Sequence, residues 1–449
     1  MTDTAFDART PPPPAEAAVP GAPIIQRDGS RAALAEGPLT TADGTPLKTA
    51  LGRATRRARW RAFVLVAPLL LFVLVTFAVP IVQMLHRSVH NDAFSANMPA
   101  VSEWLRANEL PADAAPGEEA FAALREDLVT TRENRTIGSV ATRVNYDYPG
   151  ASSLFKSSAR KAGRMEPPFR QALLDADDEW GDPALWSAMK GASSAYTGNF
   201  YLTAVDLERA SDGSIQRVDE RRRIYVPLFV KTFVLSAVIT GLCFLLGFPV
   251  AHLLANLPLR TSNLLMICVL LPFWTSLLVR TTAWIAMLQS EGVVNDTLVA
   301  TGVLDDASRV QMIYNETGTI VAMTHILLPF MILPLYSVMR TIPPSYVRAA
   351  RSLGATPWTA FWRVYFPQTV PGIGAGALLV FILALGYYIT PALVGGAKGT
   401  LISNIIAEAM LSWNNWSLAA AMGAILLVGV LVLYWVYDRI VGIDNMKLG

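Results

Sequence analysis

Six long apolar stretches constrain this 449-residue chain more than any other feature. The first, residues 62–85, reads AFVLVAPLLLFVLVTFAVPIVQML. An α-helix rises about 1.5 Å per residue, so about 20 apolar residues cross the roughly 30 Å hydrocarbon core of a bilayer. The other five stretches lie at 226–257, 263–288, 318–339, 372–395 and 417–437. These lengths predict an all-α polytopic membrane protein with six transmembrane helices.

Composition agrees with a membrane protein. Of all residues, 53% are hydrophobic and only 16% are charged, whereas a soluble domain is about 25% charged. The formal net charge of +2 is too small to indicate nucleic acid as a partner. Both cysteines, Cys243 and Cys268, lie in apolar runs. We expect them to be buried packing residues and not metal ligands or a disulfide framework.

Basic residues beside the spans predict the orientation of the chain, because short cytoplasmic loops carry an excess of Lys and Arg. Five arginines precede the first span, namely Arg53, Arg56, Arg57, Arg59 and Arg61. Counting spans then places the loop 340–371 on the same inner side. The predicted outer loops, 289–317 and 396–416, carry only Arg309 and Lys398. We therefore expect a multi-pass protein of a bacterial inner membrane with both termini in the cytoplasm.

Composition also divides the chain into regions. The first two regions are a disordered cytoplasmic tail (1–60) and the first transmembrane helix (61–85). They are followed by a periplasmic helical insert (86–225), a five-helix transmembrane core (226–440) and a cytoplasmic C-terminal tail (441–449). Apolar spacing at 117–128 and 168–190 predicts helices within the insert. Two roles for the insert stay open, a docking platform for an external partner or a lineage-specific cap.

The cytoplasmic loop 341–371 is the most informative segment. Pro343 and Pro344 are expected to end the preceding helix, and Ser345 can cap a new one. Gly354 supplies a left-handed turn that a side chain would resist. A second short helix is expected to begin near Pro357.

Pro367 and Pro371 are expected to close this loop before the fifth span. The prediction is a basic helix–Gly turn–helix element. Physical reasoning alone also allows such an element to lie in the lipid headgroup layer.

A family resemblance decides between these readings of the loop. The spacing Ala349-Ala350-x-x-x-Gly354, nine residues, then Val364-x-Phe366-Pro367 resembles the Glu-Ala-Ala loop of ABC-importer permeases, in which Arg348 stands where Glu is usual. Other segments resemble the spermidine/putrescine-type branch, namely 247–251, 271–276 with Arg280, 328–330 and 388–396. The resemblance covers about 225–440 and the first span.

The resemblance implies the type I ABC importer (MetI-like) permease fold with an added extracytoplasmic insert. It implies a permease subunit that passes a small nitrogenous solute, polyamine-type foremost, from a periplasmic binding protein into the cytoplasm by alternating access. The further partners it implies are cytoplasmic ABC ATPase subunits, a second and different permease subunit, and membrane lipid. The residues it assigns to ATPase coupling are Arg348, Ala349, Ala350, Gly354, Val364 and Pro367.

Four residues are candidates for the translocation path. Arg280 is a charged residue well inside the predicted third span, so it should either face a water-filled route or serve as a snorkelling or clamping residue. Trp274, Tyr387 and Tyr388 could form an aromatic surface for a cationic substrate, or simply pack and anchor the spans.

Several kinds of chemistry are absent from the sequence. Gly395 to Thr400 does not have the spacing of a nucleotide-binding P-loop, so we expect ATP hydrolysis to occur on a partner chain. Four scattered histidines predict no metal site, and nothing indicates a cofactor or an enzyme. Two alternatives stay open, an ion-gradient-driven secondary transporter and a membrane-anchored sensor with an external ligand domain.

Overall fold

The structure is a computed structural model that describes residues 47–111, 114–209 and 214–441. The chain divides into two compact units, the first ending at Ile81 and the second beginning at Val82. Most of the predicted N-terminal tail, 1–46, and most of the C-terminal tail, 442–449, lie outside the described residues.

The first unit contains a long apolar helix. Helix α1 spans Leu47–Val73 and continues through a π-helical turn, η1 (Leu74–Ala78), into α2 (Val79–Val89). The prediction of a disordered tail over 1–60 is therefore wrong for residues 47–60. Their Arg- and Ala-rich sequence favours helix, and the apolar helix that follows propagates through it.

The π-helical turns in the described part of the chain each precede a proline. The turn η1 ends two residues before Pro80, and η6 (Phe361–Tyr365) ends two residues before Pro367. In both, the next backbone N–H bonds to the carbonyl five residues back. Proline lacks an N–H, and its ring clashes with the carbonyl four residues earlier. A wider turn accommodates the proline without ending the helix.

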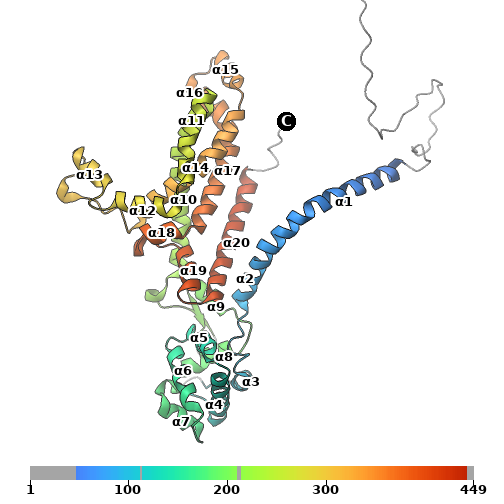
Figure 1. The fold of residues 1–449 in the computed structure, drawn as a ribbon, viewed down its shortest axis with the longest axis vertical. Helices are drawn as coiled ribbons and strands as arrows, with labels where there is room; N and C mark the ends of the chain where they lie inside the picture. The colour runs from blue at the N-terminus through green and yellow to red at the C-terminus, as the bar shows by residue number, and fades with distance from the viewer. Residues whose placement is uncertain (1–46, 112–113, 210–213, 442–449) are drawn as a thin grey trace, which may run out of the picture. The chain divides into compact units, whose positions relative to one another are not determined.

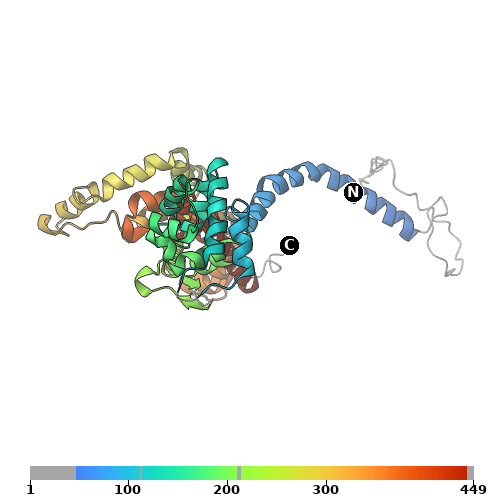
Figure 2. The ribbon, with the colours of Figure 1, turned by 90° about the horizontal axis from the view of Figure 1, so that it is seen from below.

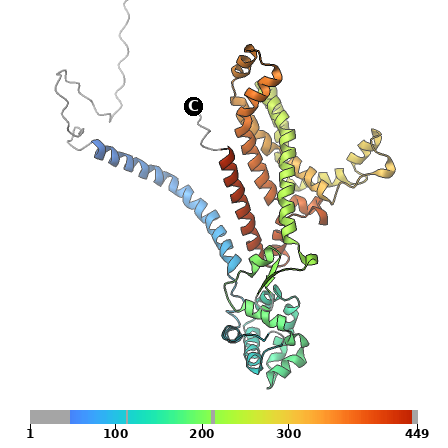
Figure 3. The ribbon, with the colours of Figure 1, turned by 180° about the vertical axis from the view of Figure 1, so that it is seen from behind.

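Four long helices of the second unit run side by side, as Figures 1 and 3 show: α10 (Tyr225–Asn256), α14 (Glu316–Thr341), α17 (Phe366–Gly386) and α20 (Trp416–Val441). Helices α10, α14 and α17 share one hydrophobic core. Gly247 and Gly376 both approach Met331, because an added Cβ would lie 3.2 Å from its Cγ and 2.8 Å from its Sδ. These glycines allow α10 and α17 to pack closely on α14.

The predicted third span, 263–288, is not one continuous helix. It consists of α11 (Leu259–Leu270), the 3₁₀ turn η4 (Leu271–Trp274) and α12 (Leu277–Leu288), and the helix axis bends by 95° at the break. Thr275 and Ser276 adopt extended backbone between the two helices. Helix α12 leads into α13 (Val293–Ala300), and together they form an arm that projects to one side of the bundle (Figure 2). Hydropathy alone does not distinguish a broken apolar run from a straight one.

The predicted fifth span, 372–395, is wrong at both ends. Residues Pro357–Gly386 form one helical stretch, made of α16 (Pro357–Ala360), η6 and α17. Pro367 and Pro371 therefore lie inside this stretch and do not separate the loop from the span. The helix ends at Gly386 because Tyr387 is extended, and a separate short helix, α18 (Ile389–Val394), follows.

The insert is helical and has its own hydrophobic core. Its helices are α3 (Pro99–Ala107), α4 (Glu118–Glu133), α5 (Ile137–Asn145), α6 (Ala151–Ala162), α7 (Phe169–Ala176), η2 (Asp178–Gly181) and α8 (Pro183–Ala192). The helices expected within 117–128 and 168–190 are thus present. Trp180 and Trp186 are buried at the centre, against Phe155 and Phe121 at ring distances of 5.1 and 4.9 Å.

The two ends of the insert meet at a narrow neck. The N–H of Asn91 donates to the carbonyl of Ala195 (2.8 Å), and the N–H of Thr197 donates to that of Val89 (2.8 Å). Beyond the neck come α9 (Asn199–Ala204), the antiparallel strands β1 (Leu207–Arg209) and β2 (Ile215–Arg217), and η3 (Glu220–Arg222). The remaining short elements are η5 (Asp306–Ser308), η7 (Ala397–Gly399) and α19 (Ile402–Leu411).

Candidate functional site

The loop after α14 begins with two prolines. Helix α14 ends at Thr341, and α15 (Pro344–Ser352) starts after the extended residue Pro343. Pro344 occupies the first turn of α15, where its missing N–H costs no helical hydrogen bond. The predicted cap at Ser345 is therefore wrong, since Pro343 precedes the helix and no side chain caps it.

Gly354 ends α15 as the sequence predicts. Its φ of +90° is left-handed, and its N–H donates to the carbonyl of Arg351 at 3.0 Å. The N–H of Ala355 reaches back to the carbonyl of Ala350 at 3.1 Å. This pair of bonds is the Schellman arrangement that ends many helices. Because an added Cβ at Gly354 would meet open space, backbone strain and not a clash opposes a side chain here.

Helix α15 exposes nearly its whole surface. Arg348 and Ala349 are exposed and Ala350 is half-exposed. Leu353, at the end of the helix, is 89% exposed, and Trp358 at the start of α16 is 72% exposed. Residues 341–371 contain three arginines and no acid. The loop therefore presents a basic, partly apolar surface.

Aromatic rings join the base of the loop to α10. Phe248 lies 6.2 Å from Phe361 and 5.7 Å from Phe366, measured between ring centroids. His252, one turn further along α10, lies 5.0 Å from the ring of Tyr365. Such ring pairs contribute about 0.5–1.5 kcal/mol each beyond the area they bury. Val364 is half-buried beside this cluster and Pro367 is exposed.

A hydrogen bond next to the loop also joins the end of α14 to the end of α10. The guanidinium Nη1 of Arg340, in the last turn of α14, donates to the carbonyl of Ala255 at 2.8 Å. This carbonyl belongs to the last turn of α10, where carbonyls lack helical partners. Movement of the loop would therefore be transmitted to α10, α14 and α17 together.

The four path candidates lie around the broken span. Trp274 in η4 is 71% exposed, so its ring is not packed inside this chain. Arg280 lies on α12, half-exposed, and its Nη2 donates to the carbonyl of Thr275 at 3.4 Å. Tyr387 and Tyr388 lie between α17 and α18, and their carbonyls accept bonds of 2.7 Å from Ser403 and Asn404 of α19.

The structure brings two of these candidates together. Helix α12, which carries Arg280, reaches α18 next to Tyr387, where the hydroxyl oxygens of Thr281 and Thr390 lie 3.5 Å apart. Trp284 Nε1 donates to Nδ1 of His325 at 3.1 Å. Arg280 Nε has no hydrogen-bond acceptor among the described residues. A polar cluster thus joins α12, α14 and the start of α18, and Trp274 occupies the turn before it.

Comparison with known proteins identifies the family. The family model described as binding-protein-dependent transport system inner membrane component matches residues 243–441. The spermidine/putrescine transport system permease protein PotB of Haemophilus influenzae is 35% identical over 254 residues, which cover 56% of this chain and 84% of the relative. This chain belongs to the binding-protein-dependent inner-membrane permease family. The Escherichia coli K12 PotB permease is 34% identical over 235 residues, covering 51% and 85% of the two chains.

A solved structure was also compared with this permease. A chain of a bacterial ABC transporter involved in the import of the acidic polysaccharide alginate is 21% identical to it, with a TM-score of 0.43, and the match covers 64% of this chain and 99% of that chain.

Family membership fixes the broad role of the permease. It is an inner-membrane transport subunit whose family works with ATPase subunits and a substrate-binding protein, and it is not itself an enzyme. This favours ATP-driven import over the ion-gradient and sensor alternatives. The matched region contains the loop 341–371 but not the insert. Among the described residues, no three metal-ligating side chains gather, although His86 and His90 stack at 4.6 Å.

Sequence reasoning missed the aromatic base of the loop. Its signal was nevertheless present, because Phe248 and His252 are four residues apart, as are Phe361 and Tyr365. Residues at this spacing lie on one face of a helix and can meet a partner helix together. The prediction that both cysteines are buried is wrong for Cys268, which is exposed on α11, whereas Cys243 is buried.

Proposed function

We propose that this permease imports a polyamine-type solute, which an external binding protein delivers and ATP hydrolysis on partner subunits drives inward. The named relatives, which are spermidine/putrescine permeases at 34–35% identity, support the solute class. No acid lies in the middle of a predicted span. Selectivity for a cation is therefore assigned mainly to the binding protein.

The loop geometry carries the coupling part of the proposal. Helix α15 is exposed along its length, so a partner can cover it, with the small residues Ala349 and Ala350 allowing close approach. Gly354 sets the angle to the second helix, and Val364 and Pro367 lie where that helix enters the bundle. We assign α15 to a groove of the ATPase. Nucleotide can then shift the permease between inward- and outward-open states only if it binds one state of the assembly better.

Arg348 predicts the sign of the charge on the ATPase surface that binds the loop. It stands where the family usually has Glu, and Arg351 and Arg363 add to the positive charge of the loop. An acidic groove on the partner would complement this surface, whereas a basic groove would repel it. Substituting Arg348→Glu should therefore weaken ATPase binding, and the opposite change in the groove should restore it.

The broken span supports a second permease subunit. The extended residues Thr275 and Ser276 and the charge of Arg280 are unsuited to lipid, because backbone polar groups at membrane depth require protein or water around them. We assign a second, different permease chain to this side. Arg280, Trp274, Tyr387 and Tyr388 would then line the route between the two subunits.

The sidedness of the permease follows from the same assignment. An ATPase-binding loop must be cytoplasmic, and so must both termini by the number of spans and the charge rule. The insert then lies in the periplasm, where the binding protein arrives.

Reconstitution tests this proposal. Proteoliposomes containing the permease, its partner subunits and the binding protein should accumulate labelled spermidine only when ATP is present on the loop side. Omitting the ATPase subunits is the matched control and should abolish accumulation. Uptake that continues without the ATPase, or that stops only when an ion gradient is collapsed, would contradict the proposal.

A further inference from the structure

A cavity of about 480 Å³ lies where the insert meets the rest of the second unit. Its walls come from α5 and the start of α6 in the insert, from α9, from the first residue of α10, and from the turn between α19 and α20. Core voids in proteins rarely exceed the size of a water molecule, whereas ligand sites occupy about 300–1,000 Å³. The size of this cavity is therefore that of a ligand site.

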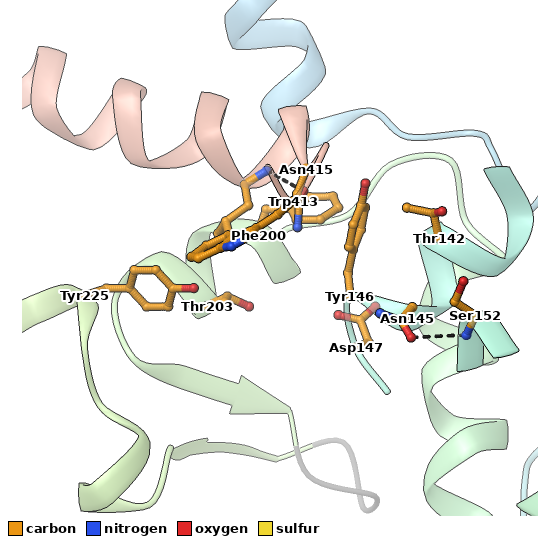
Figure 4. A pocket seen from close by; sticks show the side chains of 11 residues that line it. Thr142, Asn145, Tyr146, Asp147, Ser152, Phe200, Thr203, Tyr225, Trp413 and Asn415 are labelled. Carbon is orange, nitrogen blue, oxygen red and sulfur yellow. Dashed lines mark hydrogen bonds between the residues drawn. The ribbon is translucent and has the colours of Figure 1, made fainter. Parts of the chain in front are cut away.

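Aromatic rings and hydrogen-bond acceptors line the cavity together. Figure 4 shows Phe200, Tyr225 and Trp413 on one side and Tyr146 and Asp147 on the other. The amides of Asn145 and Asn415, the hydroxyls of Thr142, Ser152 and Thr203, and the side chain of Leu418 complete the wall. Ring faces attract cations, and acceptor oxygens bind ammonium N–H groups. This mixture suits an organic cation with an alkyl body.

A buried cation contacts two of the wall residues from behind. The guanidinium of Arg143 lies 5.2 Å from the ring centroid of Phe200, and its Nη1 bonds to Asp147 Oδ2 at 2.8 Å. Arg143 is 1% exposed and does not line the cavity, so it packs behind the wall residues Phe200 and Asp147 and leaves the cavity free. The pair shows how a positive group fits here, over a ring and against a carboxylate.

Two carboxylates lie at or near the cavity. Asp147 is balanced by Arg143, but a second buried carboxylate, Asp206, lies behind Tyr225. Asp206 accepts backbone N–H bonds at the start of α10, with Val226 at 2.7 Å, and has no ion-pair partner among the described residues. The three backbone N–H groups at the start of α10 compensate the charge of Asp206, so the carboxylate that lies on the wall itself is that of Asp147.

We infer that this cavity is an acceptor site for an alkyl polyamine, where the solute binds between release by the binding protein and entry into the spans. The inference rests on the proposed function, because it takes its solute class from there. The insert, which supplies part of the wall, lies outside the region that the family model matches. Its position beside the α19–α20 turn connects it to the bundle, because Ile402 of α19 donates its N–H to Thr232 Oγ1 of α10 at 2.9 Å.

Equilibrium binding to the assembled transporter in lipid nanodiscs tests the inference without the binding protein present. Labelled spermidine is the probe, and a linear dicarboxylate of similar length is the competitor of opposite charge. Wild-type protein should bind spermidine, and excess dicarboxylate should not displace it. Trp413→Leu removes one ring of the wall and should weaken binding about tenfold, the scale of a desolvated cation–π contact.

Trp416→Leu is the matched control, because Trp416 lies three residues away, is partly exposed and does not line the cavity. It should bind spermidine as the wild type does. Thr203→Phe fills the cavity without removing a ring or a charge, so it should also weaken binding even if Trp413→Leu assembles poorly.

Two results would overturn the inference. One is unchanged spermidine binding in both Trp413→Leu and Thr203→Phe, and the other is displacement by the dicarboxylate. ATP-driven spermidine uptake by the same wild-type preparation separates the two proposals. If uptake is normal while the cavity variants bind normally, only the acceptor site fails. If wild-type protein takes up no spermidine, the proposed function fails and the acceptor site fails with it.

Discussion

The insert and the loop 341–371, which we propose as the ATPase-coupling loop, differ in how much of their apolar surface they bury. The insert buries two tryptophans and three phenylalanines in a core of its own, and its ends meet at a hydrogen-bonded neck. Helix α15 of the coupling loop buries no residue completely. The loop is held by the aromatic base near Phe248 and by the tie from Arg340.

This difference separates stability from function. Burial of large rings stabilises the insert, whereas the coupling loop keeps apolar and basic groups on its surface, where a partner can cover them. Substitutions in the insert core should therefore lower local stability. Substitutions on α15 should lower transport while leaving the fold intact.

The largest expected effect is at Gly354. Gly354→Asp places a side chain and a negative charge at a left-handed residue of the coupling loop, so we expect uptake to be abolished with normal membrane insertion. Gly302→Asp is the control, because Gly302 has a φ of +73° and equally open surroundings but lies in the arm. Uptake and insertion should both survive there. Normal uptake by Gly354→Asp would contradict the claim that the loop serves transport whereas the insert core serves stability.

The second-largest effect is expected from replacing a buried tryptophan of the insert, compared with an exposed tryptophan of the coupling loop. Trp180→Ala removes a fully buried ring and its Nε1 bond to Ser158 (2.9 Å), and should destabilise the insert by about 3–5 kcal/mol. Trp358→Ala, at a 72% exposed position of the coupling loop, should leave stability unchanged but reduce uptake. Hydrogen exchange of the insert helices and spermidine uptake measure the two quantities. An equal loss of protection in both variants would contradict the comparison.

A smaller effect depends on pH. Asp127 is 2% exposed, and burial raises its pKa from 3.8 to about 6 although the N–H of Val101 bonds to it at 2.7 Å. Between about pH 4 and 6 the carboxyl group of Asp127 is protonated in the folded insert but ionised in the unfolded chain. Raising the pH through this window therefore lowers the stability that Asp127 contributes, by at most about 3 kcal/mol.

Comparison with Asp127→Asn isolates this effect. The substitution has no such titration, so the wild type should lose stability relative to it between pH 4 and 6, with no further change at higher pH. Hydrogen exchange of α3 and α4, corrected for intrinsic rates, measures the difference. A difference that stays constant with pH would show that the buried carboxyl titrates normally.

The smallest effect is at the contact between the insert and the bundle. Tyr146→Phe removes the bond from the tyrosine hydroxyl to the carbonyl of Asn414 (2.9 Å) and should loosen the α19–α20 turn by about 1 kcal/mol. Tyr148→Phe is the control, because its hydroxyl bonds to Asp182 inside the insert at 2.8 Å. Exchange of the turn amides should increase in the first variant only.

The sequence was sufficient to predict four of the six apolar spans and the turn at Gly354, because both depend on local chemistry. It could not predict that Pro367 lies within a helix, since a π-helical turn absorbs the proline. It could not predict the break before Leu277, because apolar residues flank it on both sides. The contacts of α12, which carries Arg280, are made with α14 and α18, which only the folded chain brings together. The cavity was also unpredictable, because its walls come from segments up to about 270 residues apart.

Cysteine labelling of Ala349→Cys, in a background without Cys243 and Cys268, tests the central claim that an ATPase covers the exposed helix α15. A membrane-impermeant maleimide should label the residue in inside-out vesicles stripped of ATPase, and adding back the ATPase should block the reaction. Labelling of intact spheroplasts, or labelling that the ATPase leaves unchanged, would contradict the account.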